Sequence, residues 1–313
     1  MKRITLLLLL VVFAGCLTAY PQKKEAPKRQ GWDYQYYYEP PREIPLYGNV
    51  DSVTITEYPL VEKAGRRVVD KVRERSVYKF NSKGDVVECV CRDGDGSLRY
   101  KNLYKYDSQG NLIESVSYGS DGSLRYKNLY KYDSQGNMIE VAHYNGDGSL
   151  WRKELYKYDL QGNMIEETWY NSNGSLDCKH LYKYDSQGNK IEEVEYNSDG
   201  SLNWKTLYKY DSRGRLIESA IDHLDGPSFK TLYKYDSQGN MIEDALYRGG
   251  VLEFKYINKY DAHGNIIKHT HMMAADHYSR TYKHDSQGNC IEIVTHWDSG
   301  DFFLTLLKIV YRK

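Results

Sequence analysis

The chain has 313 residues, and its 43 Lys plus Arg balance 43 Asp plus Glu to a formal net charge of zero. A balanced charge provides no long-range field to steer the protein toward nucleic acid or an anionic membrane surface, so we expect no nucleic-acid partner. Tyrosine is abundant, with 32 residues against 6 phenylalanines. This favours strands whose aromatic rings are dry at one end and wet at the hydroxyl.

The N-terminus has the layout of a secretory signal, because Lys2 and Arg3 precede an apolar run at 4–13 and Ala14-Gly15-Cys16 follows it. It resembles a bacterial lipoprotein signal. The resemblance implies that residues 1–15 are a signal peptide and that Cys16 becomes the lipidated first residue of the mature chain. The alternative is a short apolar anchor with an incidental cysteine. The run is too short to cross a bilayer, which needs about 20 apolar residues.

Residues 16–45 are rich in proline and show neither helical nor strand periodicity, so we expect them to form a lipidated tether. Val53 and Ile55 then alternate with Thr54 and Thr56, which predicts a strand. A further strand is expected within 67–80. We therefore predict that residues 46–76 supply N-terminal capping strands, which would cover the open end of the repeat array that follows.

A repeat array occupies residues 77–313. The phrase Leu-Tyr-Lys-Tyr-Asp-Ser-Gln-Gly-Asn at 181–189 recurs along it with a period of 25 or 26 residues. Its copies begin at Val77, Leu103, Leu129, Leu155, Leu181, Leu207, Leu232, Ile257 and Thr281. Each copy holds two apolar runs between turn clusters and leaves no room for a helix. The array is therefore predicted to be all-β, a long antiparallel meander of two-strand repeats.

The hairpin turns set the expected register. Gly188 lies where a short loop needs a left-handed residue, which places Asp185 opposite Asn189. Direct pairing from there puts Tyr182 opposite Glu192. A two-residue stagger per repeat then predicts that the sheet coils into a superhelical or barrel-like form with its tyrosines, valines and methionines inside. Glu192 would lie on that same face and would need a polar partner there.

The Tyr-Asp-x-x-Gly core of the repeat resembles the YD repeat of the RHS family, and Asp211-Ser-Arg-Gly-Arg215 matches that motif in full. Other copies carry Asn after the glycine, as at Gly110-Asn111. The resemblance covers about 77–293. In large RHS proteins such repeats form a β-strand shell around a toxic C-terminal domain. The resemblance therefore implies the shell architecture and an extracellular setting, without the toxin function.

No catalytic residue is expected. Catalysis needs one distinct constellation, whereas the recurrent glutamates supply many copies of one environment. We expect no cofactor and no metal. Cys89 and Cys91 lack the second ligand pair of a zinc site, and the late histidines are interpreted as degenerate repeat positions. The histidines concerned are His263, His269, His271, His277, His284 and His296. Cys178 and Cys290 are each alone in distant repeats, so the cysteines form no disulfide framework. A lipid-facing outer-membrane barrel is disfavoured because one face carries Lys and Glu.

Two functions are consistent with this sequence. The first is a lipid-anchored cell-envelope scaffold, structural or for protein interaction, held in the outer membrane and facing the periplasm or the cell surface. The second is a glycan-binding surface module, in which recurrent aromatic rings contact sugar faces. Its candidate ligand-binding residues are Trp151, Trp169, Trp204, Tyr182 and Tyr208. Exposure of these rings discriminates between the two, and function is to be sought where the copies differ.

Overall fold

The computed structural model describes residues 50–63, 66–224, 226–262, 264, 266–273, 277–297 and 301–311. Within them the chain forms one antiparallel sheet of 21 strands and contains no helix, which confirms the predicted fold class. No helix of the described residues is long and apolar enough to cross a membrane. The signal peptide, the tether and Cys16 lie outside the described residues.

The strands follow one another in chain order. They are β1 (Val50–Lys63), β2 (Arg66–Val69), β3 (Glu74–Phe80), β4 (Val86–Asp93), β5 (Leu98–Tyr106), β6 (Leu112–Tyr118), β7 (Leu124–Tyr132), β8 (Met138–Asn145), β9 (Leu150–Tyr158), β10 (Met164–Asn171), β11 (Leu176–Tyr184), β12 (Lys190–Asn197), β13 (Leu202–Tyr210), β14 (Leu216–His223), β15 (Phe229–Tyr235), β16 (Met241–Arg248), β17 (Val251–Tyr260), β18 (Ile266–Met273), β19 (His277–His284), β20 (Cys290–Trp297) and β21 (Phe302–Tyr311).

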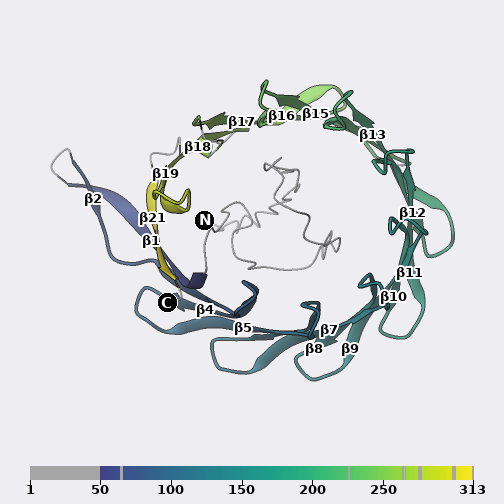
Figure 1. Ribbon diagram of the computed structural model, residues 1–313, viewed down its shortest axis with the longest axis horizontal. Coiled ribbons are helices and arrows are strands. Elements are labelled where there is room, and N and C mark those ends of the chain that lie inside the picture. Colours follow the sequence, from purple (N-terminus) through teal and green to yellow (C-terminus); the bar gives the residue numbers. More distant parts are fainter. Residues whose placement is uncertain are drawn as a thin grey trace, which may run out of the picture.

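The sheet closes into a ring of 20 strands (Figure 1). β1 pairs with β3 on one side and with β21 on the other, while β2 pairs with the end of β1 as a hairpin that projects from the ring. The strands expected to cap an open end therefore close the ring instead. Closure gives the backbone N–H and C=O groups of both edge strands hydrogen-bond partners. A capping strand would itself leave one edge unpaired.

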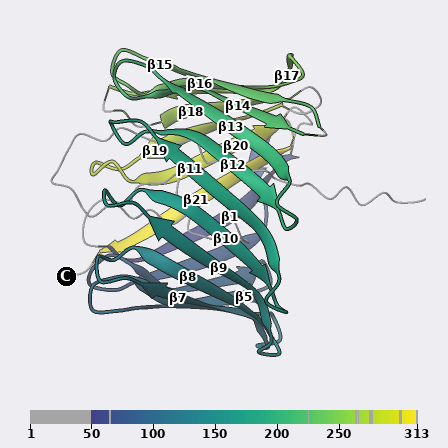
Figure 2. The same cartoon turned by 90° about the vertical axis from the view of Figure 1, so that its right-hand side faces the viewer.

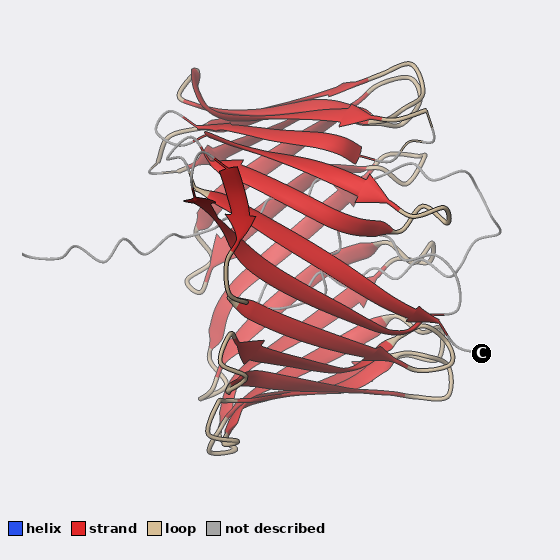
Figure 3. Cartoon of the chain, turned by 90° about the vertical axis from the view of Figure 1, so that its left-hand side faces the viewer, coloured by secondary structure: helices blue, strands red, loops and turns tan. Residues whose placement is uncertain are grey.

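The strands tilt across the wall, and the hairpin loops gather at its two rims (Figures 2 and 3). The predicted turn pairing is confirmed, because the Asp185 N–H donates to the Asn189 carbonyl at 2.9 Å and Gly188 has a φ of 81°. The Asp185 Oδ1 also accepts the backbone N–H groups of Gln187 and Asn189. The Asp-Ser-Gln-Gly-Asn segment is thus a turn stabilised by hydrogen bonds among its own residues, and it repeats along one rim.

The strand register differs from the prediction by one residue. Lys183 pairs with Glu192 whereas Tyr184 pairs with Lys190, so a β-bulge leaves Ile191 without a partner of its own. An extra residue on one strand moves every later side chain to the other face. Tyr182 therefore pairs with Glu193, and the prediction that placed Glu192 on the tyrosine face is wrong.

Glu192 belongs to an ion-pair ladder on the other face. Its carboxylate lies 2.7 Å from the Lys183 ammonium on β11 and 2.6 Å from that of Lys205 on β13. The same Lys-Glu-Lys arrangement recurs around the wall, with the Glu side chains 16–19% exposed. Its other glutamates are Glu88, Glu114, Glu140, Glu166, Glu218 and Glu243.

The tyrosine face is the inner face of the ring. It holds the most deeply buried large side chains, including Tyr100 at 2% exposure, as expected where the side chains of a curved sheet converge. Met138 is buried there against Tyr132, so tyrosine and methionine lie inside as predicted. Val194 does not, because the register shift pairs it with Leu181 and Lys205 on the ladder face.

The tyrosine before each turn aspartate links successive hairpins. The Tyr184 hydroxyl donates to the Met164 carbonyl at 2.7 Å, one repeat earlier in the chain. The equivalent bonds are Tyr106 to Val86, Tyr132 to Leu112, Tyr158 to Met138, Tyr210 to Lys190, Tyr235 to Leu216 and Tyr260 to Met241. This recurring bond explains why the phrase retains Tyr-Asp in nearly every copy.

Candidate functional site on the inner face

The copies differ mainly at the middle of the inner face. The position of Trp169 on β10 is taken by His143 one repeat earlier and by Glu195 one repeat later. The position of His180 on β11 is likewise taken by Glu154 and by Thr206. The outer ladder keeps its Lys and Glu from β3 to β17 and is broken at β18, where Lys268 takes the Glu position. The charged and aromatic groups thus vary more on the side of the wall that faces into the ring than in the outer ladder.

A first polar cluster joins β7, β8 and β9. The His143 Nδ1 lies 2.9 Å from the Asn128 amide oxygen, and its Nε2 lies 3.2 Å from the Glu154 carboxylate. The Tyr156 hydroxyl donates to the same carboxylate at 2.6 Å. Burial acts to raise the pKa of Glu154, but these partners and Arg152 outweigh it and hold that pKa below its usual value. Glu154 is therefore a buried, charged anchor.

A second cluster centres on Glu167 of β10. Its carboxylate accepts the Trp169 indole N–H at 2.6 Å and the Tyr182 hydroxyl at 2.7 Å. Burial raises the pKa of Glu167 despite these bonds. Two neighbouring carboxylates of the inner face, Glu154 and Glu167, are thus shifted in opposite directions by their surroundings.

A third cluster lies on β11, β12 and β13. The His180 Nε2 is 3.5 Å from the Cys178 sulfur and 3.4 Å from the Glu195 Oε2. The Asn203 amide donates to the other oxygen of Glu195 at 2.5 Å. Burial raises the pKa of the Cys178 thiol to about 12. Cys178, His180 and Glu195 form a group of three side chains of types that can coordinate a metal ion.

Lys190 supplies a cation beside these clusters. It occupies the slot that is Met164 one repeat earlier, and its ammonium donates to Glu193 at 2.7 Å. The Tyr208 hydroxyl donates to the same oxygen of Glu193. The Lys190 ammonium also lies 4.8 Å from the centre of the Tyr208 ring. The cation is thus held by charge and by an aromatic face.

The predicted ligand-binding aromatics do not form an exposed stripe. Trp169 and Trp204 pack on His180, with ring centres 5.1 and 5.8 Å from its imidazole. Tyr182 is 8% exposed beside them. Trp151 is the exception, because its side chain is 42% exposed next to His143. The structure brings three of the five candidates together around a histidine that sequence reasoning did not select.

Sequence reasoning missed His143, Arg152, Glu154, Glu167, His180 and Glu195 as a group. A signal for them was present, since each differs in residue type from at least one neighbouring copy. This signal was hidden because a bulge near the start of every second strand moves the side chains that follow it to the opposite face of the sheet. Positions that share the inner face could not be aligned until the bulges were known.

Two of the late histidines, His269 and His271, pack against the inner wall. His269 Nδ1 lies 2.6 Å from the Asn258 amide oxygen, and burial, with Arg280 and His271 nearby, lowers the pKa of His269 to about 4. The His271 ring stacks on Tyr256 at 4.4 Å. His263 lies outside the described residues. These contacts explain His269 and His271 as packing positions.

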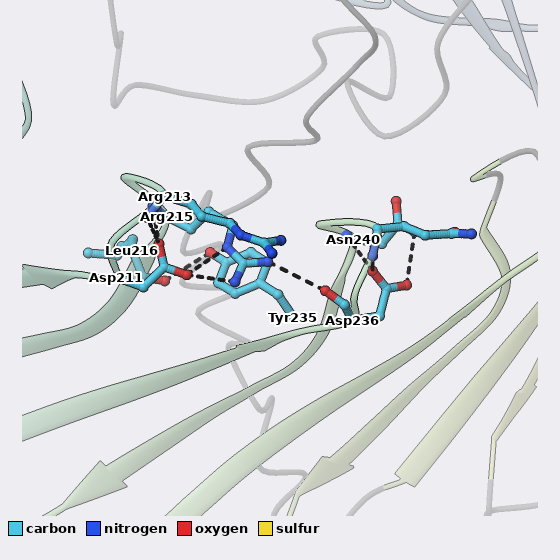
Figure 4. A network of polar contacts seen from close by, with 8 residues as sticks. Asp211, Arg213, Arg215, Leu216, Tyr235, Asp236 and Asn240 are labelled. Carbon is cyan, nitrogen blue, oxygen red and sulfur yellow. Dashed lines mark hydrogen bonds and ion pairs between the residues drawn. The ribbon is translucent and has the colours of Figure 1, made fainter.

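The one full YD-type motif uses its arginine to join two turns (Figure 4). The Arg215 guanidinium lies 2.6 Å from the Asp211 carboxylate and donates to the Asp236 carbonyl of the next turn at 3.4 Å. It also lies 4.7 Å from the centre of the Tyr235 ring. Asn240 fills the same place in the next turn with a bond to Asp236. The arginine of this motif therefore connects two neighbouring turns at the rim of the ring.

Comparisons with known proteins match the chain to one family model and to a number of solved structures. Residues 182–300 match a family described as "Uncharacterised protein". No curated protein matches the chain. Among solved structures, a TcdB2-TccC3-Cdc42 complex is 12% identical with a TM-score of 0.35, covering 85% of this chain. The chain spans 18% of the length of that relative.

Two porin-like proteins are also similar in structure. The one from Bacteroides uniformis is 11% identical with a TM-score of 0.37, covering 83% of this chain and 96% of its own. The one from Bacteroides vulgatus is 14% identical with a TM-score of 0.26, covering 84% of this chain and 99% of its own.

Proposed function

We propose that this protein is a lipid-anchored scaffold of the bacterial cell envelope, facing the periplasm or the cell surface, whose ring binds a protein partner against its inner wall. The observation that carries the proposal is the contrast between the two faces. The outer face repeats one ion-pair ladder, whereas the inner face places different charged and aromatic groups in each repeat. A wall that only maintained the shape of the ring would not need different residues in each repeat. Recognition of a partner does need them.

The width of the ring supports a partner inside it. Side chains can fill an interior of about 8 strands, and barrels of about 16 to 18 strands leave a channel. In a ring of 20 strands, inner side chains on opposite walls are too far apart to meet. The buried clusters run along the wall between neighbouring strands, as for Met138, Val141 and Tyr156. The inner face can therefore contact something other than itself.

The ion-pair ladder on the outer face is consistent with a ring whose outer surface contacts water. A wall in contact with lipid carries a continuous apolar band, and charged side chains in it are destabilising. Here Lys105, Lys131 and Lys157 are 65–69% exposed on the outer face. Attachment to the membrane would then depend on the lipid at Cys16, outside the described residues.

Site-specific photo-crosslinking in cells tests the partner proposal. Ile221 and Asp222 are consecutive on β14 and face opposite sides, since Ile221 pairs with Thr206 and Asp222 with Lys205. A photo-reactive residue at 221 should give a discrete crosslinked protein, and the same residue at 222 should not. Equal products from both positions, or none from 221, would contradict the proposal.

Fractionation tests the anchor. Cys16→Ala should release the protein from the membrane fraction, whereas Thr18→Ala, two residues away, should leave it there. If Cys16→Ala stays with the membrane, the lipid-anchor part of the proposal is wrong, while the inner-face part stands on the crosslinking result.

Glycan binding remains a second candidate because of one residue. Trp151 is 42% exposed, and the Arg152 guanidinium lies 4.9 Å from the centre of its ring. An exposed indole beside a donor suits a sugar face and its hydroxyls. On a glycan array, Trp151→Ala should abolish a signal that the half-buried Trp204→Ala retains. An array without any bound glycan would exclude this candidate.

A further inference from the structure

We propose that Cys178, His180 and Glu195 form a binding site for a divalent transition metal, of which zinc is the best match. The inference is independent of the proposed scaffold function. The sequence predicts no metal site, whereas the folded chain brings Cys178, which is alone in its repeat, to His180 and Glu195.

The fold places the three ligands on one face. Cys178 and His180 are two residues apart on β11, so both point to the inner side. Glu195 on β12 pairs directly with His180 across the strands. The histidine nitrogen, the cysteine sulfur and a carboxylate oxygen are the donor types that zinc takes from proteins, and they come here from a sheet rather than a loop.

The distances suit a small contraction around one ion. Zinc bonds of about 2.0 to 2.3 Å in a tetrahedron put neighbouring ligand atoms roughly 3.3 to 3.8 Å apart. The His180 Nε2 is already 3.5 Å from the Cys178 sulfur and 3.4 Å from the Glu195 Oε2. All three ligand atoms lie within 4.8 Å of one another. Binding therefore needs the cysteine sulfur and the glutamate oxygen to approach each other by at most about 1.5 Å, which side-chain rotation can supply.

The surroundings also fit a bound ion. Asn203 donates to one oxygen of Glu195 and leaves the other directed at His180, as an outer partner of a metal ligand does. Trp169 and Trp204 cover the imidazole, which is 6% exposed as part of His180. One thiolate and one carboxylate would neutralise a dication. A neutral complex is far less costly to bury than a bare charge.

The site is specific to this repeat. The equivalent positions one repeat earlier hold Arg152, Glu154 and Trp169, which cannot form the same donor set. Metal binding would displace the proton of the Cys178 thiol, so that one proton is released as the sulfur–metal bond forms. The affinity should therefore fall as the pH is lowered.

Cobalt(II) titration of the full, reduced chain provides the test. Wild type should bind one ion per chain, develop a thiolate-to-cobalt charge-transfer band, and lose fluorescence from Trp169 and Trp204, and zinc should reverse both signals. Cys178→Ser should abolish the band and weaken zinc binding at least tenfold. Cys290→Ser, a buried thiol on β20, is the matched control and should behave as wild type.

Glu195→Gln provides a second variant that keeps the thiol. It should retain the charge-transfer band but weaken zinc binding about tenfold. Thermal unfolding without metal shows which variants are folded, and at least one of the two must be folded for the comparison. The proposal is overturned if wild type gives no band, or if a folded Cys178→Ser or Glu195→Gln binds zinc as tightly as wild type. It is equally overturned if Cys290→Ser loses as much affinity as Cys178→Ser.

Discussion

The tyrosine-to-carbonyl bonds between hairpins make a quantitative prediction. Tyr184→Phe removes the hydroxyl that donates to the Met164 carbonyl at 2.7 Å and leaves the packed ring in place. Because a net protein hydrogen bond contributes about 1 kcal/mol, the free energy of unfolding should fall by about that amount. For a domain of about 250 residues this corresponds to a Tm lower by about 2 °C.

A cumulative substitution enlarges the effect. Tyr158 and Tyr210 make the same bond one repeat to either side of Tyr184. The triple Tyr→Phe variant should lose about 3 kcal/mol if the three bonds are independent. The measurement is equilibrium unfolding in guanidinium chloride, with near-ultraviolet circular dichroism to confirm that the folded states match.

Tyr144 provides the control. It lies on the outer face opposite Lys127, and its hydroxyl makes no hydrogen bond within the described part of the chain. Tyr144→Phe should leave the unfolding free energy unchanged. If Tyr184→Phe costs no more than Tyr144→Phe, the hydrogen bonds between hairpins do not stabilise the ring and the reasoning is refuted.

Three further variants test the turn and two half-buried groups of the inner face. Gly188→Ala should cost about 1 kcal/mol because Gly188 has a φ of 81°, whereas Ser186→Ala in the same turn should cost less, and equal costs in chemical unfolding would contradict this. Burial raises the pKa of Asp244 to about 6 from 3.8, so wild type should lose up to about 3 kcal/mol of stability between pH 4 and pH 6. Asp244→Asn should remove that loss, and parallel stability curves would refute the assignment. The pKa of His269 lies at about 4 instead of 6.5, so its contribution is present above pH 6.5 and is lost as the pH falls toward 4. His269→Gln should flatten this part of the curve, and an unchanged slope would show that other groups cause it.

The sequence by itself determined the strands and the turns at both rims. A repeat such as 181–189 carries its turn residues, its alternation and its period locally, and these are the features that short-range chemistry decides. Asp185 opposite Asn189 could therefore be predicted and was confirmed. The coiling of the sheet followed from the stagger between repeats, which is also a local property.

The tertiary structure decided the faces, the closure and the candidate sites. The bulge at Ile191 is one extra residue in a run of apolar and acidic side chains, and no composition marks it, yet it moves Glu192 to the outside and Glu193 to the inside. Whether β1 meets β21 depends on the sum of twist and shear over the whole ring rather than on any one repeat. The approach of Cys178 to Glu195 depends on the same register. Groups that are distant in sequence become neighbours only when every intervening pairing is known.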